Sequence, residues 1–141
     1  METVLESRNF ADQASSVELT NPAYQAFTIL RVGFTVAPII AGVDKFLGLL
    51  VNWDQYLPSV VNNLLGGHGH QFMYAVGIIE VIAGIGIALK PRIFGYVVAA
   101  WLFVIIANLL MIPGYFDVAL RDLGLALGAL ALARLAAVYD N

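Results

Sequence analysis

The sequence predicts an all-α integral membrane protein, a four-helix bundle whose helices run up, down, up and down. Three observations predict this fold. Of the 141 residues, 60% are hydrophobic and only 12% are charged, about half the usual charged share of a soluble domain. Four apolar stretches are each long enough to cross a hydrocarbon core of about 30 Å. Very short turns join the last three stretches, so neighbouring helices are expected to run antiparallel.

The chain divides into a polar tail and a membrane bundle. Residues 1–22 form the tail, which is acidic where a signal peptide is basic. Residues 23–141 form the bundle. Its four predicted spans cover about 27–51, 72–89, 93–112 and 115–138.

The breaks between spans follow from residue chemistry. A long loop over 52–71 separates the first two spans and carries Trp53, which is suited to the headgroup level. Pro91 ends the second span, because proline cannot continue the helical hydrogen-bond ladder. Pro113-Gly114 ends the third span in the same way.

Lysine and arginine placement predicts the orientation in the membrane. Lys90 and Arg92 lie in the turn after the second span, on the same side as both termini, and the loop over 52–71 has no lysine or arginine. Because basic residues favour the cytoplasmic side, we expect cytoplasmic termini. The membrane is expected to be a prokaryotic inner (cytoplasmic) membrane.

Several functional classes are disfavoured by composition. The net charge of −3 and the lack of a basic patch argue against nucleic-acid binding. The chain has no cysteine, which excludes disulfides, thiolate nucleophiles and cysteine-bound metals. His68-Gly69-His70 is only half of a metal site, and we predict no metal.

Polar side chains inside the spans are the candidate functional residues, because a charge in the bilayer costs a few kcal/mol unless it finds a partner. Charged residues occur in the first, second and fourth spans, and the third contains an asparagine. They are Arg31, Asp44, Lys45, Glu80, Asn108, Asp117, Arg121 and Asp122.

Helical spacing predicts which of them meet. Glu80 lies between Gly77 and Gly84 on a small-residue face that permits close helix contact. Arg121 is predicted to lie at about the depth of Lys45, so a polar cluster inside the bundle is one hypothesis.

The alternative is a structural role. Asp117 and Arg121 are four residues apart and can neutralise each other on one helix. Buried ion pairs also fix helix register without chemistry. Arg31 either reaches Glu80 or extends to the headgroups. Trp101, Tyr74 and Tyr96 either stack on a ring-shaped ligand or pack as ordinary span residues.

Four short motifs make the sequence resemble the DoxX-like family of small four-helix membrane proteins, over residues 27–138. The motifs are Leu30-Arg31-Val32-Gly33, Gly42-Val43-Asp44-Lys45, Gly77-Ile78-Ile79-Glu80 and Arg121-Asp122-Leu123-Gly124-Leu125. The family is named after a membrane subunit of an archaeal thiosulfate:quinone oxidoreductase, and its members look like membrane partners of redox or detoxifying proteins. The positions this resemblance marks are Arg31, Lys45, Glu80, Asn108, Arg121 and Asp122.

The resemblance implies an accessory or scaffold subunit of a larger membrane complex, respiratory or redox in kind, that is not catalytic by itself. Its expected partners are the lipid bilayer and other membrane or redox subunits, with no intrinsic cofactor. An alternative is a quinone-interacting subunit, in which Glu80 exchanges a proton with a bound quinone and Arg121 or Lys45 holds a carbonyl oxygen. A small-solute carrier is a third hypothesis.

Overall fold

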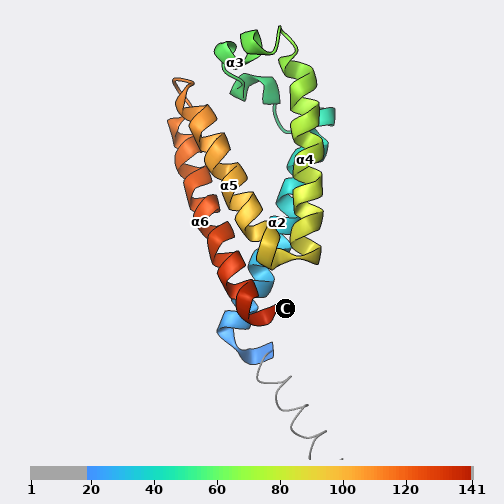
Figure 1. Ribbon diagram of the computed structural model, residues 1–141, viewed down its shortest axis with the longest axis vertical. Helices are drawn as coiled ribbons and strands as arrows, with labels where there is room; N and C mark the ends of the chain where they lie inside the picture. The colour runs from blue at the N-terminus through green and yellow to red at the C-terminus, as the bar shows by residue number, and fades with distance from the viewer. Residues whose placement is uncertain (1–18, 141) are drawn as a thin grey trace, which may run out of the picture.

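The computed structural model describes residues 19–140, and every regular element in that range is a helix. The predicted polar tail lies outside the described residues except for 19–22. Four helices are long and two are short (Figure 1). They are α2 (Pro22–Leu47), η1 (Trp53–Tyr56), α3 (Ser59–Leu64), α4 (Gly69–Leu89), α5 (Pro91–Leu110) and α6 (Phe116–Tyr139).

The helix ends follow from local chemistry. The Asn21 side chain accepts a hydrogen bond from the Ala23 amide, and Pro22 occupies the first turn of α2, where a missing N–H costs nothing. Gly48 ends α2 with φ 65°, a left-handed conformation that glycine adopts without strain. The helix therefore starts five residues and stops four residues earlier than the predicted span of 27–51.

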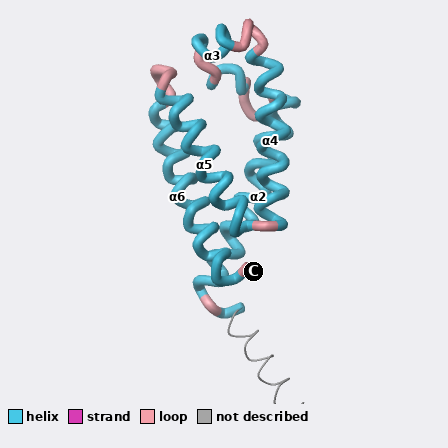
Figure 2. Tube along the Cα trace, in the orientation of Figure 1, coloured by secondary structure: helices cyan, strands magenta, loops and turns pink. Residues whose placement is uncertain are grey.

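The long helices form two pairs. Helix α5 packs mainly on α6, and α2 packs mainly on α4, while smaller α2–α6 and α4–α5 contacts join the pairs. Figures 1 and 2 show the pairs close together near the α4–α5 turn and farther apart at the other end. We call the end that carries residues 48–68 the loop end, and the end at the α4–α5 turn the turn end.

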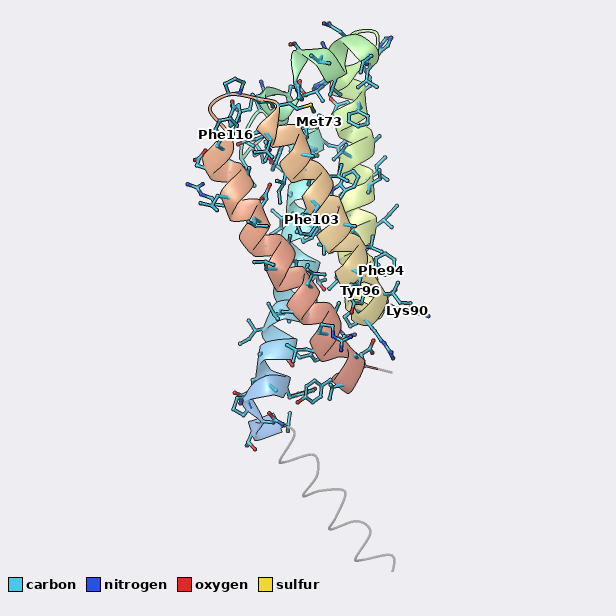
Figure 3. All side chains as sticks on the ribbon, turned by 60° about the vertical axis from the view of Figure 1, so that its left-hand side comes forward. Met73, Lys90, Phe94, Tyr96, Phe103 and Phe116 are labelled. Atoms are coloured by element: carbon cyan, nitrogen blue, oxygen red, sulfur yellow. The ribbon has the colours of Figure 1, made fainter. Side chains whose placement is uncertain are left out.

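The apolar core lies at the turn end, where the two pairs meet. Ile87 of α4 and Leu132 of α6 are completely buried there. Tyr24 and Phe27 of α2 contact the ring of Tyr139 of α6, with ring centroids 5.3 and 5.7 Å apart. In Figure 3, Phe94 of α5 lies at the same end. This packing joins the two helix pairs at the turn end.

The outside of the bundle is apolar. Large hydrophobic side chains such as Ile29, Leu89 and Leu120 are about 70% exposed (71%, 71% and 69%). All four long helices are long and apolar enough to cross a membrane. Because contiguous apolar surface of this extent is unfavourable in water, the chain is an integral membrane protein. The prediction of four membrane helices is confirmed at this level.

Candidate functional site

A buried ion pair joins α2 to α4. Lys45 Nζ lies 2.6 Å from Glu80 Oε2, and their side chains are 4% and 12% exposed. Lys45 is in the last turn of α2, and Glu80 is at the centre of α4. The prediction that these two residues belong to one polar cluster inside the bundle matches their positions.

Close backbone contact brings the pair together. A Cβ atom on Gly42 would lie 2.5 Å from the Gly77 carbonyl oxygen, and one on Gly77 would lie 2.7 Å from the Gly42 carbonyl oxygen. Real side chains do not tolerate such distances, so only glycine allows this approach. Gly42 precedes Lys45 by three residues, and Gly77 precedes Glu80 by three. The glycine contact therefore sets the register in which the two charges meet.

Asp44 is the second buried charge of α2, and it organises the loop end. Its carboxylate accepts hydrogen bonds from the amides of Leu49 (2.9 Å) and Leu50 (3.1 Å) and from the Trp53 indole N–H (2.9 Å). Three N–H donors satisfy a carboxylate that is 4% exposed. Asp44 thus folds the chain back over the end of α2.

Trp53 covers the ion pair. Its indole ring lies 3.9 Å from Lys45 Nζ, a cation–π contact. Because Asp44 holds the indole N–H, the ring stays over the ammonium group. The sequence suggested a headgroup position for Trp53 and did not predict this contact. One sequence signal could have indicated it: the two adjacent charges Asp44 and Lys45, with Trp53 nine residues after Asp44.

The α5–α6 pair adds two polar groups to the interior. Asp122 of α6 is half-buried, and its carboxylate interacts electrostatically with Glu80. The Trp101 indole nitrogen is buried and has no hydrogen-bond partner among residues 19–140. Trp101 lies seven residues from Asn108 on one stripe of α5, so both belong to the same side of the helix. Glu80 therefore has two charged neighbours, the Lys45 ammonium group at 2.6 Å and the Asp122 carboxylate.

Arg31 does not reach Glu80. Its guanidinium donates to the carbonyl of Ala88, in the last turn of α4, and also lies 5.8 Å from the centre of the Phe27 ring. Ala88 is eight residues from Glu80, or about 12 Å along the helix. The hypothesis of an Arg31–Glu80 contact is not supported by this geometry, because the arginine is used at the turn end, where it satisfies a helix-terminal carbonyl.

Asn108 and Arg121 also have their contacts with residues other than the ion pair. Asn108 Nδ2 donates to the Tyr56 carbonyl, 2.7 Å away, and so ties α5 to η1. Arg121 lies 3.7 Å from Asp117 on its own helix, with side chains 75% and 63% exposed. The alternative prediction of an i,i+4 pair therefore describes Arg121, and the predicted interior position for it is wrong.

His70 of the predicted half-site takes part in a hydrogen-bonded group at the loop end. Its Nδ1 lies 2.7 Å from Asp54 Oδ2, and its Nε2 lies 2.7 Å from the Tyr74 hydroxyl. Tyr74 stacks on Phe46 with ring centroids 5.0 Å apart. Within residues 19–140, no group of three or more acidic, histidine or cysteine side chains is placed to hold a metal.

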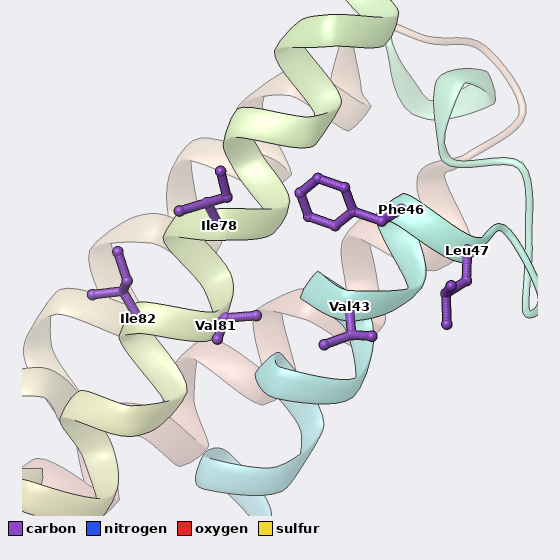
Figure 4. Close-up of a pocket in the computed structure, with 6 residues that line it drawn as sticks. All are labelled: Val43, Phe46, Leu47, Ile78, Val81 and Ile82. Atoms are coloured by element: carbon purple, nitrogen blue, oxygen red, sulfur yellow. The ribbon is translucent and has the colours of Figure 1, made fainter.

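An apolar groove runs along the outer surface of the α2–α4 pair (Figure 4). It encloses about 390 Å³. Its lining is entirely aliphatic and aromatic, and consists of Val43, Phe46, Leu47, Ile78, Val81 and Ile82. Phe46 and Val81 are the chain neighbours of Lys45 and Glu80, so the groove lies along the same stretch of both helices as the ion pair.

The fold and these contacts define an integral membrane protein of four long helices with an ion pair buried between α2 and α4. Comparison with known protein families, with curated proteins and with solved structures finds no match for this chain.

Proposed function

We propose that this chain is an accessory membrane subunit of DoxX-like type, a scaffold within a larger membrane assembly of respiratory or redox kind. One observation carries the proposal. The buried charged side chains of the spans have their partners within the chain. Lys45 Nζ lies 2.6 Å from Glu80 Oε2, and the Asp44 carboxylate accepts hydrogen bonds from three N–H donors. Charges that satisfy each other fix helix register and leave the outer faces for lipid and partners.

The α2–α4 groove is where we place a partner. Helix association in lipid depends on close van der Waals packing, and a grooved apolar face offers more contact to a neighbouring helix than a smooth one. The groove of about 390 Å³ accepts large apolar side chains from a partner helix.

The test is copurification from mild detergent, with a variant that fills the groove. Ile82→Trp puts a bulky ring into the groove, and Val104→Trp puts the same ring on the exposed face of α5, where the original side chain is 60% exposed. We expect Ile82→Trp to lose the partner chains and Val104→Trp to keep them. If the chain purifies alone in its parent form, the accessory-subunit proposal fails.

We further propose that the helices cross the membrane in up-down-up-down order, with the loop end outside and both termini in the cytoplasm of a prokaryotic cell. Since the chain has no cysteine, single cysteines test this directly. A cysteine at exposed Asn63 should react with an impermeant thiol reagent on intact cells, and one at exposed Lys90 should not. The reverse pattern would invert the orientation.

A quinone-interacting subunit is the second candidate, favoured by the groups that lack a full set of partners. Among residues 19–140, the buried Trp101 indole N–H has no hydrogen-bond partner, and Asp122, whose carboxylate interacts electrostatically with Glu80, forms no ion pair. A quinone has two carbonyl acceptors, and its reduction to a quinol takes up two protons with two electrons, which a redox partner must supply.

Asp122→Asn is the variant that tests the quinone alternative, because it removes an acid without breaking the Lys45–Glu80 pair. Quinone reduction by the copurified complex should fall, and extracted lipid should contain less bound quinone. Leu123→Asn is the control, since it adds the same side chain at the exposed neighbouring position. Equal turnover in both variants would remove the quinone alternative.

A further inference from the structure

The four residues of η1 (Trp53–Tyr56), which we call the cap, all contact the bundle at the loop end. Trp53 contacts Asp44 and Lys45 of α2, at 2.9 and 3.9 Å. Asp54 contacts His70 of α4 at 2.7 Å. The cap is thus joined to both helices that carry the ion pair.

The other two cap residues contact the second helix pair. Gln55 accepts a hydrogen bond from the Tyr115 hydroxyl at 3.3 Å. The carbonyl of Tyr56 accepts one from Asn108 of α5 at 2.7 Å, and the Tyr56 ring lies 5.0 Å from the Tyr115 ring. One short helix therefore bridges the two pairs at the end where they are farther apart (Figure 1).

The cap is held by a small number of side-chain contacts and contributes no fully buried side chain to the apolar core. The Asp54–His70 contact is between side chains that are 39% and 57% exposed, and such pairs contribute little. Non-helical residues lie on both sides of the cap, over 48–52 and 57–58. None of the large, fully buried side chains of the molecule belongs to the cap. Its displacement would break a few polar contacts and leave the apolar core at the turn end intact.

We propose that the cap is a gate that opens to expose the Lys45–Glu80 pair to water on the loop side. Trp53 is the gating residue, because its ring covers Lys45 and its indole N–H is anchored by Asp44. Opening replaces the cation–π contact with hydration of the ammonium group. The inference does not depend on the accessory role proposed above, since it concerns access to the ion pair whatever that pair serves.

A single cysteine at Met73 reports on the gate. Met73 is buried, 8% exposed, and lies seven residues before Glu80 on the same face of α4, towards the loop end (Figure 3). The variant Met73→Cys in lipid nanodiscs is treated with a water-soluble thiol reagent. Both faces of a nanodisc are open to the reagent, so membrane orientation does not affect the result.

In the parent background we expect slow but complete labelling whose rate levels off at high reagent concentration, because opening then limits the reaction. Adding Trp53→Ala should raise the rate by roughly tenfold, which corresponds to an activation free energy for opening that is about 1.4 kcal/mol lower. Trp53→Phe keeps the ring and loses the N–H bond to Asp44, so its rate should fall between the two.

Two further cysteines separate gating from loss of structure. Asn63→Cys lies on the exposed surface of α3 and should react quickly in every background. Ala126→Cys lies in the fully buried core of α6 and should stay unreactive in every background. The proposal is overturned if Met73→Cys never reacts in the parent, or if its rate is the same with and without Trp53. It is also overturned if both Trp53 variants make Ala126→Cys reactive, because Trp53 then supports the whole bundle.

Discussion

Lys45 and Glu80 stand on different helices, 35 residues apart in the chain, yet their charged atoms lie 2.6 Å from each other in the interior. Neither side chain has enough exposure to keep its hydration, so each depends on the other. Gly42 and Gly77 let the two backbones approach at this level. The charge pair and the glycine contact are therefore parts of one helix–helix joint.

Breaking the ion pair from one side should destabilise the protein strongly. Lys45→Met leaves Glu80 as an uncompensated buried charge, and Glu80→Gln leaves Lys45 in the same state. We expect each to lower the free energy of unfolding by about 3–5 kcal/mol. Denaturant unfolding in mixed micelles, followed by circular dichroism, measures the change.

The double variant Lys45→Met/Glu80→Gln supplies the control for this prediction. It removes both charges, so it should be clearly more stable than the sum of the two single losses predicts. Strictly additive losses would show that the two residues are not coupled, and that the short distance between them has no energetic weight.

The glycine contact makes a second prediction. Gly42→Ala adds a methyl group that would lie 2.5 Å from the Gly77 carbonyl oxygen and 2.8 Å from Val81 Cγ2. The helices must separate, and we expect a loss of about 1–3 kcal/mol in the free energy of unfolding. Gly33→Ala on the same helix is the matched control, because a Cβ there meets no atom within 4 Å. Equal stability of the two variants would contradict the close contact.

Much of the fold was predictable from the sequence because it depends on composition and on strong breaks. Pro91 starts α5, and Gly114, with φ 100°, lies in the turn before α6. The boundaries of α2 were displaced, since Pro22 begins the helix inside a segment that is polar by composition. Hydropathy marks where lipid begins, whereas the N-capping side chain of Asn21 and the proline that follows it mark where the helix begins.

The site was predictable only in part, for a geometric reason. Spacing places Glu80 on a small-residue face, and that face does meet α2 at Gly42. Spacing gives no information about how a long side chain turns, so it left open whether Arg31 reaches Glu80 or the headgroups and whether Arg121 joins the interior or pairs with Asp117. The contact between Trp53 and Lys45 depends on a loop, and periodicity does not describe loops.

Arg121 is expected to contribute little, although it lies in one of the motifs that resemble the DoxX-like family. Its partner Asp117 is on the same helix at 3.7 Å, and both side chains are mostly exposed. Arg121→Ala should change the free energy of unfolding by less than about 1 kcal/mol. The unfolding assay used for the ion pair measures it. A loss as large as that of Lys45→Met would mean that Arg121 serves the interior after all.

Arg31 should matter at the turn end, because it bridges α2 and the last turn of α4. Its guanidinium donates to the Ala88 carbonyl, one of the helix-terminal acceptors that have no partner within the helix. We expect Arg31→Met to cost about 1–2 kcal/mol, the range for a charged donor at a helix C-terminus. Amide hydrogen exchange near Leu89 and Lys90 should become faster, because the end of α4 loses its tie to α2.

Arg92→Met is the control for Arg31, since Arg92 is exposed at the same end and its loss changes the net charge equally. It should leave both the stability and the exchange near Leu89 unchanged. If Arg92→Met speeds exchange as much as Arg31→Met does, the effect comes from the general positive potential of the turn end. The hydrogen bond between Arg31 and Ala88 would then have no separate role in holding α4 against α2.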